Sequence, residues 1–210
     1  MSIRSHVLAV ACLVALAGSA QAQPGTAYLQ VRGGALVPVG SFADQQNAGG
    51  AYSVAAGYEP IDFLGLELEF TQSFNDNVND RVSGPGFTII SDEVKQNFVV
   101  GLGPRVTFLP SDYPVRPFGV LQAEWYHFAN FNSVEVDGST ILSDDDEDAA
   151  GLEAGLGIEG TVFSVYERSG DEVPMLELTL GAQASYHHAF MPNRDDRQFV
   201  TAMGSLGLRF

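Results

Sequence analysis

The C-terminal stretch VTAMGSLGLRF, residues 200–210, decides the expected fold of this chain. Every second position of the stretch is apolar or small: Val200, Ala202, Gly204, Leu206, Leu208 and Phe210. Side chains of a β-strand point alternately to opposite faces, so one face of this strand is apolar and ends on an aromatic ring. The pattern predicts a strand that has lipid on one side and a polar barrel interior on the other.

Seven further stretches alternate in the same way. The clearest is LGLELEFT at 64–71, where leucines and Phe70 alternate with Gly65, Glu67 and Glu69. Each stretch is near the roughly 9–11 residues that a tilted strand needs to cross a bilayer. The expected strands are 27–37, 50–59, 63–73, 95–108, 115–128, 150–163, 174–187 and 198–210. The sequence therefore predicts an all-β protein, an eight-stranded antiparallel up-and-down transmembrane β-barrel.

The N-terminal residues have the pattern of an export signal. Arg4 supplies a positive charge, residues 7–17 are apolar, and Ala20-Gln21-Ala22 is an A-x-A cleavage site. We expect 1–22 to be a cleaved signal peptide and 23–210 to be the barrel domain. The single cysteine, Cys12, lies in the expected signal, so the mature chain has no disulfide framework, cysteine nucleophile or cysteine metal site.

The charge balance is strongly acidic. The chain has 10 Lys and Arg against 26 Asp and Glu, and loss of Arg4 changes its formal charge from −16 to −17. Nucleic acid is not expected as a partner, because phosphate binding needs clustered Lys and Arg.

The connections between expected strands alternate in length, which predicts the topology. Connections 59–62, 109–114 and 164–173 contain Pro or Gly and are mostly short, as periplasmic turns are. Connections 40–49, 73–94, 129–149 and 189–197 are polar and mostly longer, as extracellular loops are. Aromatic residues then fall at an inner rim (Tyr58, Phe108, Phe210) and an outer rim (Tyr52, Phe70, Phe98, Trp125, Tyr186).

The opening segment YLQVRGG (28–34), the glycine-rich GLGIE (155–159) and the closing GSLGLRF (204–210) resemble the small OmpA/OmpX-like outer-membrane β-barrels, which are porin-family-like proteins. This resemblance implies an integral, monomeric protein of the cell outer membrane of a Gram-negative bacterium, exported through the periplasm. It also implies contacts with outer-membrane lipids and lipopolysaccharide. The terminal segment ending at Phe210 resembles the signal read by the barrel-assembly machinery.

Charged residues fall on the inward faces of the expected strands. They are Arg32, Glu67, Glu69, Arg105, Arg116, Glu124, Glu153, Glu159, Glu177 and Arg209. We expect an interior ion-pair network that fills the lumen, because buried charges are tolerated when paired. A conduction path or an acid/base pair is the alternative interpretation. Pro104 stands mid-strand, where a missing N–H predicts a β-bulge.

The segment 129–149 holds Glu135, Asp137 and Asp144 to Asp148 without one basic residue. A solvated loop is expected here, because like charges repel. The segment lacks the spaced EF-hand pattern, although weak divalent bridging to lipopolysaccharide stays open.

The histidines favour no catalytic site. His127-Phe128-Ala129-Asn130 resembles part of the His-x-Ser-Asn segment of lipid A deacylase barrels, but Ala129 replaces the nucleophilic serine. We expect His187 and Ser185 to form an interior hydrogen-bonding pair, and His127 and His188 to lie at the rim. The sequence thus predicts no catalytic, cofactor-binding or metal residues.

These observations predict a structural or surface-interaction protein that acts through four extracellular loops and is not an enzyme. A lipid A-modifying enzyme barrel and a narrow, low-conductance channel are the alternatives.

Overall fold

The computed structural model describes residues 25–44, 46–75, 80–84, 87–110, 113–136, 139–166, 174–192 and 195–210. The expected signal peptide, 1–22, lies outside these residues. No helix within the described ranges has the length and hydropathy to cross a membrane.

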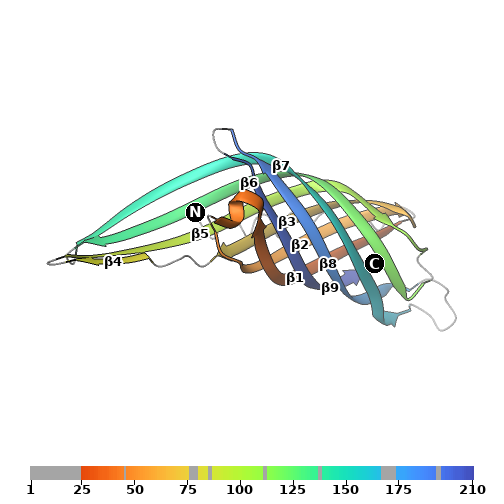
Figure 1. Cartoon of the computed structure of the whole chain (residues 1–210). Coiled ribbons are helices and arrows are strands. Elements are labelled where there is room, and N and C mark those ends of the chain that lie inside the picture. Colours follow the sequence, from red (N-terminus) through yellow and green to blue (C-terminus); the bar gives the residue numbers. More distant parts are fainter. Residues whose placement is uncertain are drawn as a thin grey trace.

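Eight long antiparallel strands form a closed barrel (Figure 1). They are β1 (Thr26–Val39), β2 (Gly49–Ile61), β3 (Leu64–Asn75), β5 (Phe87–Thr107), β6 (Val115–Val136), β7 (Ser139–Val165), β8 (Leu176–Phe190) and β9 (Arg197–Arg209). Each strand pairs with the next in this order, and β1 pairs with β9, with Gly33 opposite Gly204, to close the sheet. A short 3-10 helix, η2 (Gly40–Asp44), follows β1, and β4 (Asp80–Gly84) pairs, among the described strands, with β5 alone. The predicted eight-stranded barrel is confirmed.

The two faces of the barrel wall have the predicted character. Leu66, Leu102 and Leu156 point outward and are 55%, 50% and 67% exposed. Glu67 and Glu153, which alternate with such leucines, are buried inside the barrel. An apolar outer surface around a polar lumen suits contact with lipid. The closed sheet also satisfies the backbone hydrogen-bonding groups, which lipid cannot do.

Three strands are much longer than predicted. β5, β6 and β7 run on together past the closed barrel and, with β4, form one end of the molecule, opposite the C-terminus (Figure 1). We call this end the outer end. The β6–β7 ladder continues to Val136 opposite Ser139, whereas the β7–β8 ladder stops at Ala150 opposite Phe190. The expected loops 73–94 and 129–149 are therefore largely strand. Apolar and polar residues must alternate only where a strand lies between lipid and lumen. Beyond the membrane this requirement is absent, so the sequence pattern did not predict the outer parts of these strands.

The predicted bulge at Pro104 is wrong. Leu102 lies opposite Ala123 and Arg105 opposite Val120, so the β5–β6 register is the same on both sides of Pro104. A Cβ on the neighbouring Gly103 would lie 2.0 Å from the Leu121 carbonyl oxygen, so this glycine allows β5 and β6 to approach closely. The barrel wall therefore accommodates Pro104 through the close approach of β5 and β6, and their register does not change. Register shifts occur instead between Tyr58 and Ile61, and between Thr161 and Phe163.

Candidate functional site

An ion-pair network centred on Glu67 occupies the middle of the lumen. The Glu67 carboxylate accepts hydrogen bonds from Arg32 Nη2 at 2.9 Å and Arg105 Nη1 at 3.1 Å. Tyr28 Oη at 2.7 Å and Gln122 Nε2 at 3.0 Å donate to the same carboxylate. The side chain of Glu67 is fully buried, so these four donors replace the water that a carboxylate would otherwise bind.

A second group of ion pairs lies toward the end opposite the outer end. Arg105 Nη2 is 2.6 Å from Glu159 Oε2, and Arg116 also donates to the Glu159 carboxylate. Arg209 Nη2, in the last strand, donates to Glu59 Oε2 at 2.6 Å. Sequence reasoning did not count Glu59 among the inward charges, because it lies where the expected strand 50–59 meets the turn 59–62. It continues the inward alternation of Ser53 and Ala55, and that signal could have found it.

The predicted interior network is confirmed. Nine of the ten predicted inward charges are buried, and Glu177 is half-buried. Its carboxylate lies 3.7 Å from Arg209 Nη1. Arg32 also pairs with Glu69. The excess of carboxylates over arginines leaves two glutamates, Glu124 and Glu153, outside this network.

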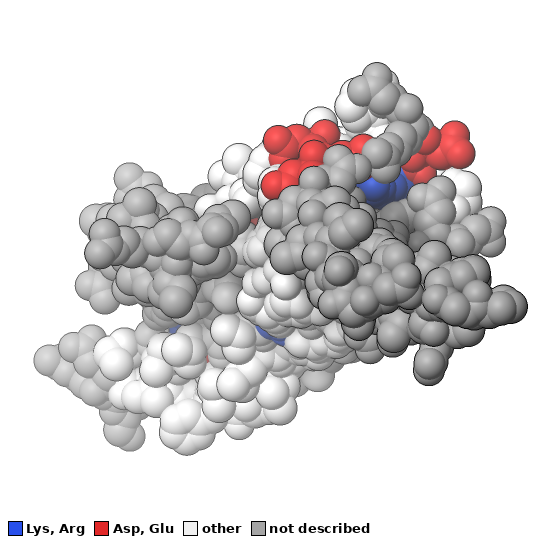
Figure 2. All heavy atoms as spheres, turned by 90° about the vertical axis from the view of Figure 1, so that its left-hand side faces the viewer, with Lys and Arg blue, Asp and Glu red and all other residues white. Residues whose placement is uncertain are grey.

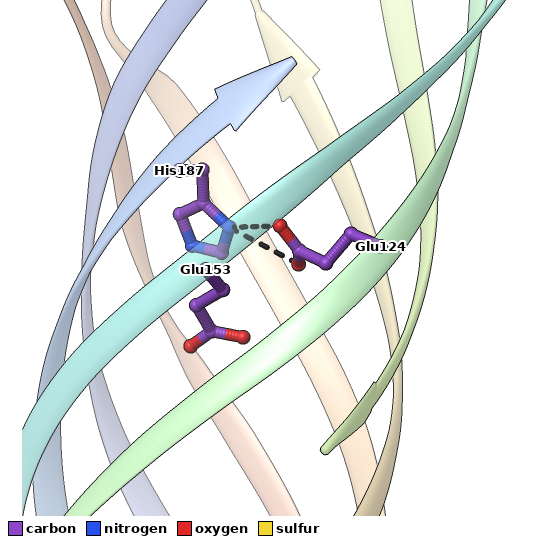
Figure 3. Close-up of side chains that lie close together, drawn as sticks. All are labelled: Glu124, Glu153 and His187. Atoms are coloured by element: carbon purple, nitrogen blue, oxygen red, sulfur yellow. Dashed lines mark hydrogen bonds and ion pairs between the residues drawn. The ribbon is translucent and has the colours of Figure 1, made fainter. Parts of the chain in front are cut away.

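Glu124, Glu153 and His187 form a separate buried cluster farther toward the outer end (Figure 3). They come from three adjacent strands, β6, β7 and β8. His187 Nδ1 lies 3.2 Å and 3.1 Å from the two Glu124 carboxylate oxygens, and His187 Nε2 lies 3.0 Å from Thr201 Oγ1. Gln183 Nε2 donates to Glu153 Oε1 at 3.1 Å. One ligand atom from each of the three residues lies within 4.8 Å of the others.

The predicted pair of His187 with Ser185 is wrong. Both side chains are buried in the lumen, but His187 bonds to Glu124 and Thr201, while Ser185 Oγ accepts from Gln183 Nε2 at 2.9 Å. Both ring nitrogens of His187 have partners on other strands, Glu124 on β6 and Thr201 on β9, so neither nitrogen is left for Ser185. The sequence pattern could place His187 inside but could not identify the strand that faces it.

The other two histidines lie at the rim, as predicted. His127 Nδ1 lies 2.9 Å from Asp148 Oδ1, and its ring stacks on Trp125 at a centroid distance of 5.9 Å. His188 Nε2 lies 2.9 Å from Asp196 Oδ2. Ala129 is buried and has no hydroxyl group. Neither rim histidine contacts a serine among the residues that the structure describes.

A cluster of apolar side chains closes the lumen between the Glu124, Glu153 and His187 cluster and the outer end. It comprises Leu36, Phe42, Ala51, Val99, Tyr126, Phe128, Ala149, Ala189, Met191, Phe199 and Met203. The Arg197 guanidinium lies 4.3 Å from the centroid of the Phe128 ring, and its Nη2 lies 2.6 Å from Glu147 Oε2. The acidic segment 129–149 thus has a basic partner from β9. Figure 2, which looks onto the outer end, shows acidic side chains gathered beside a basic group.

The comparisons with known proteins agree with this architecture. Residues 8–210 match the family described as outer membrane protein beta-barrel domain. The chain belongs to this family. It is therefore a bacterial outer-membrane β-barrel protein. A search of curated proteins found no match.

The search of solved structures found outer-membrane proteins of low sequence identity. Ail, the attachment invasion locus protein of Yersinia pestis, in complex with the heparin analogue sucrose octasulfate, has 16% identity and a TM-score of 0.51, with 90% of this chain and 100% of that chain covered. Neisserial surface protein A has 20% identity and a TM-score of 0.47, with 88% of this chain and 97% of that chain covered. The N-terminal β-barrel domain of Pseudomonas aeruginosa OprF has 15% identity and a TM-score of 0.46, with 90% of this chain and 98% of that chain covered.

Proposed function

We propose that this outer-membrane barrel is a non-catalytic structural and surface-interaction protein, and that its partner surface is the outer sheet. The outer sheet consists of β4 and of the parts of β5, β6 and β7 at 87–94, 129–136 and 139–149. The observation that carries the proposal is the continued β6–β7 pairing beyond the last β7–β8 pair. A paired sheet beyond the barrel end offers a preformed surface for recognition, at a lower ordering cost than a mobile loop.

The lumen supports this proposal over a channel. Ion pairs fill its middle and inner part, and the apolar cluster closes it toward the outer end. An eight-stranded barrel is just wide enough for its side chains to fill the interior. We expect planar-bilayer recordings to show at most rare, small openings, and a steady conductance changed by Glu67→Gln would favour the channel instead.

The rim supports this proposal over an enzyme. His127 contacts Asp148, Asp146, Trp125 and Phe98, and no hydroxyl group takes part in these contacts. A Ser/His mechanism needs a nucleophile within hydrogen-bond reach of the base. Lipid A incubated with the protein should keep its acyl chains by mass spectrometry. Loss of an acyl chain that depends on His127 would make the enzyme the better interpretation.

The partner class follows from the charge at the base of the outer sheet. The side chains of Asp146 and Asp148 are 57% and 62% exposed, and that of Asp196, between β8 and β9, is 41% exposed. Such a surface attracts cationic groups and repels polyanions. We therefore do not expect this chain to bind a sulfated ligand such as the one bound to Ail. Anionic lipopolysaccharide can contact this rim through bridging divalent cations.

Export and assembly belong to the same proposal. We infer that 1–22 are removed during export through the periplasm, that the assembly machinery reads the segment ending at Phe210, and that the barrel is a monomer among outer-membrane lipids. The A-x-A pattern at 20–22 supports the cleavage, the apolar outward face supports the lipid contacts, and the aromatic Phe210 supports the assembly signal.

Binding to charged surfaces tests the partner class. The nanodisc-embedded barrel is passed over immobilised poly-L-lysine and over immobilised heparin. We expect salt-sensitive binding to poly-L-lysine, weakened by Asp148→Asn and by replacing 132–143 with an Asn-Gly turn. The matched control is Asp62→Asn, which removes one exposed carboxylate from the β2–β3 turn at the opposite end. Stronger binding to heparin, or equal effects of the two Asn variants, would contradict the proposal.

A further inference from the structure

We infer that Glu124, Glu153 and His187 form a binding site for a divalent transition-metal ion inside the barrel. The site lies between the ion-pair network around Glu67 and the apolar cluster at the outer end. A bound ion there would join β6, β7 and β8 from within the lumen. This inference does not depend on what the outer sheet binds.

The backbone register brings the three ligands together. Glu153 of β7 lies directly opposite His187 of β8, and Glu124 of β6 lies opposite Gly151, two residues before Glu153. Figure 3 shows the His187 ring facing the Glu124 carboxylate, with the Glu153 side chain next to the ring. Zinc holds nitrogen and carboxylate ligands at about 2.0–2.2 Å, so bound ligand atoms are on the order of 3–4 Å apart. Small side-chain rotations would bring atoms that now lie within 4.8 Å to that spacing.

The cluster has at most one positive charge, on a protonated His187, for two buried carboxylates. Glu67 and Glu159 each lie within 4 Å of two or more arginines. By contrast, neither Glu124 nor Glu153 has an arginine or lysine partner among the described residues, although both are buried. Buried carboxylates in proteins are paired with cations or coordinate metal ions. A divalent ion would neutralise both of them.

The orientation of His187 is that of a metal ligand. Thr201 Oγ1 lies 3.0 Å from Nε2, so an Nε2–H that donates to Thr201 leaves the Nδ1 lone pair directed at the Glu124 carboxylate. In the metal-free site, a proton on Nδ1 joins the imidazole ring to the Glu124 carboxylate. A metal ion that displaces this proton would bind the same Nδ1 lone pair. Ligating histidines commonly donate their other N–H to a neighbouring group in this way.

A fourth oxygen ligand is available beside the cluster. Gln183 is 9% exposed, and its Oε1 has no hydrogen-bond partner among the described residues, while its Nε2 donates to Glu153. A turn of the amide group brings Oε1 to the place that Nε2 now occupies, next to the Glu153 carboxylate.

Two glycines make room around Glu153. A Cβ on Gly151 would lie 2.6 Å from Tyr126 Cε2, and a Cβ on Gly155 would lie 2.3 Å from Ser185 Oγ. Tyr126 in turn donates to Glu124, and Ser185 binds Gln183. The glycines on either side of Glu153 therefore let the residues that orient the ligands pack against β7.

The ligand types select the class of ion. An imidazole nitrogen with two carboxylates suits zinc and other first-row divalent ions, whereas Ca²⁺ and Mg²⁺ prefer oxygen ligands alone. We therefore use Zn²⁺ as the probe and Ca²⁺ as the competitor.

Metal content of the folded barrel tests the inference. The protein is refolded with Zn²⁺, dialysed, and analysed by elemental mass spectrometry and X-ray absorption. We expect one tightly held zinc with one imidazole nitrogen and otherwise oxygen ligands, which excess Ca²⁺ does not displace. Glu153→Gln should lose this zinc, and Thr201→Val should weaken its binding about 10–100-fold. The matched control is the double variant His127→Gln/His188→Gln, which removes both rim histidines and should keep the zinc.

The gel shift on boiling verifies that each variant is folded. The X-ray absorption spectrum of the unmodified protein tests the ligand set even where Glu153→Gln does not fold. The inference is overturned by a folded wild-type barrel that retains no zinc, by zinc coordinated without imidazole, or by displacement of zinc by Ca²⁺. Zinc that persists in Glu153→Gln and disappears in the rim double variant would also overturn it, because the ion would then lie at the rim.

Discussion

Arg105 Nη2 lies 2.6 Å from Glu159 Oε2, and this contact joins β5 to β7 through the lumen rather than along the sheet. Both side chains are buried, and Arg116 shares the Glu159 carboxylate. The pair therefore stabilises a barrel wall that is otherwise held by backbone hydrogen bonds between neighbouring strands.

Neutralising Glu159 should destabilise the barrel strongly. Glu159→Gln leaves buried guanidinium groups without their counter-charge, which costs about 3–5 kcal/mol in the free energy of unfolding. Urea titration in lipid vesicles measures this value. The control Asp148→Asn removes an exposed carboxylate paired with His127 and should cost about 1 kcal/mol or less. Equal losses in the two variants would contradict the structural importance of the interior network.

The outward face of β5 should not tolerate charge near its middle. Leu102 is 50% exposed and lies between the outer-rim Phe98 and the inner-rim Phe108. Leu102→Arg should lower the free energy of unfolding by about 2–4 kcal/mol, and Phe108→Arg, near the interface, by about 0–1 kcal/mol. Both are measured by refolding into vesicles. Undiminished stability of Leu102→Arg would mean that this face does not contact lipid.

The closed sheet should resist detergent until it is boiled. Within the barrel, all eight long strands are paired on both sides, and the β1–β9 seam ends with Phe210 N donating to Ala27 O at 2.9 Å. Complete pairing removes the free edge at which unfolding would begin. Unheated and boiled samples should therefore migrate differently in gel electrophoresis. Identical migration of protein extracted from membranes would count heavily against closure.

Deleting Phe210 should reduce assembly in cells more than stability in vitro. One aromatic at the rim contributes only a few kcal/mol by burial, about 1.5–3 kcal/mol for a fully buried side chain. Immunoblots of outer-membrane fractions should show less assembled barrel, while the purified chain still refolds in detergent. Phe108→Ala is the control, because it removes a rim aromatic from another strand. Equal membrane levels with and without Phe210 would remove its role as an assembly signal.

Acidification should break the hydrogen bonds that Asp196 accepts between β8 and β9. Hydrogen bonds from His188 Nε2 at 2.9 Å and from the Met191 N–H at 3.1 Å hold the pKa of Asp196 below its usual value. A depressed pKa in the folded state means that the contact is present above the ordinary value of about 3.9 and is lost as the pH falls through the lower one. The Met191 amide signal in NMR spectra should titrate with a midpoint below 3.9, and Asp196→Asn should abolish the titration. A midpoint above 3.9 would contradict the hydrogen bonds described here.

The alternation of residue types by itself determined the barrel, the strand count and the side of the wall on which each residue lies. Glu67 inside and Leu66 outside could be assigned from neighbouring letters, because a strand between lipid and lumen must change character at every residue. The same criterion failed for the outer parts of β5, β6 and β7, since no lipid constrains a strand beyond the membrane.

Only the tertiary structure decided which inward side chains meet. Glu59 and Arg209 are 150 residues apart in the chain and bond because β1 closes against β9. Likewise, Glu124, Glu153 and His187 converge through the registers of three strands, and a slip by one residue would turn a ligand toward lipid. Local sequence sets the face of a strand, but register and closure set the partner across the lumen, because they depend on the pairing of the whole sheet.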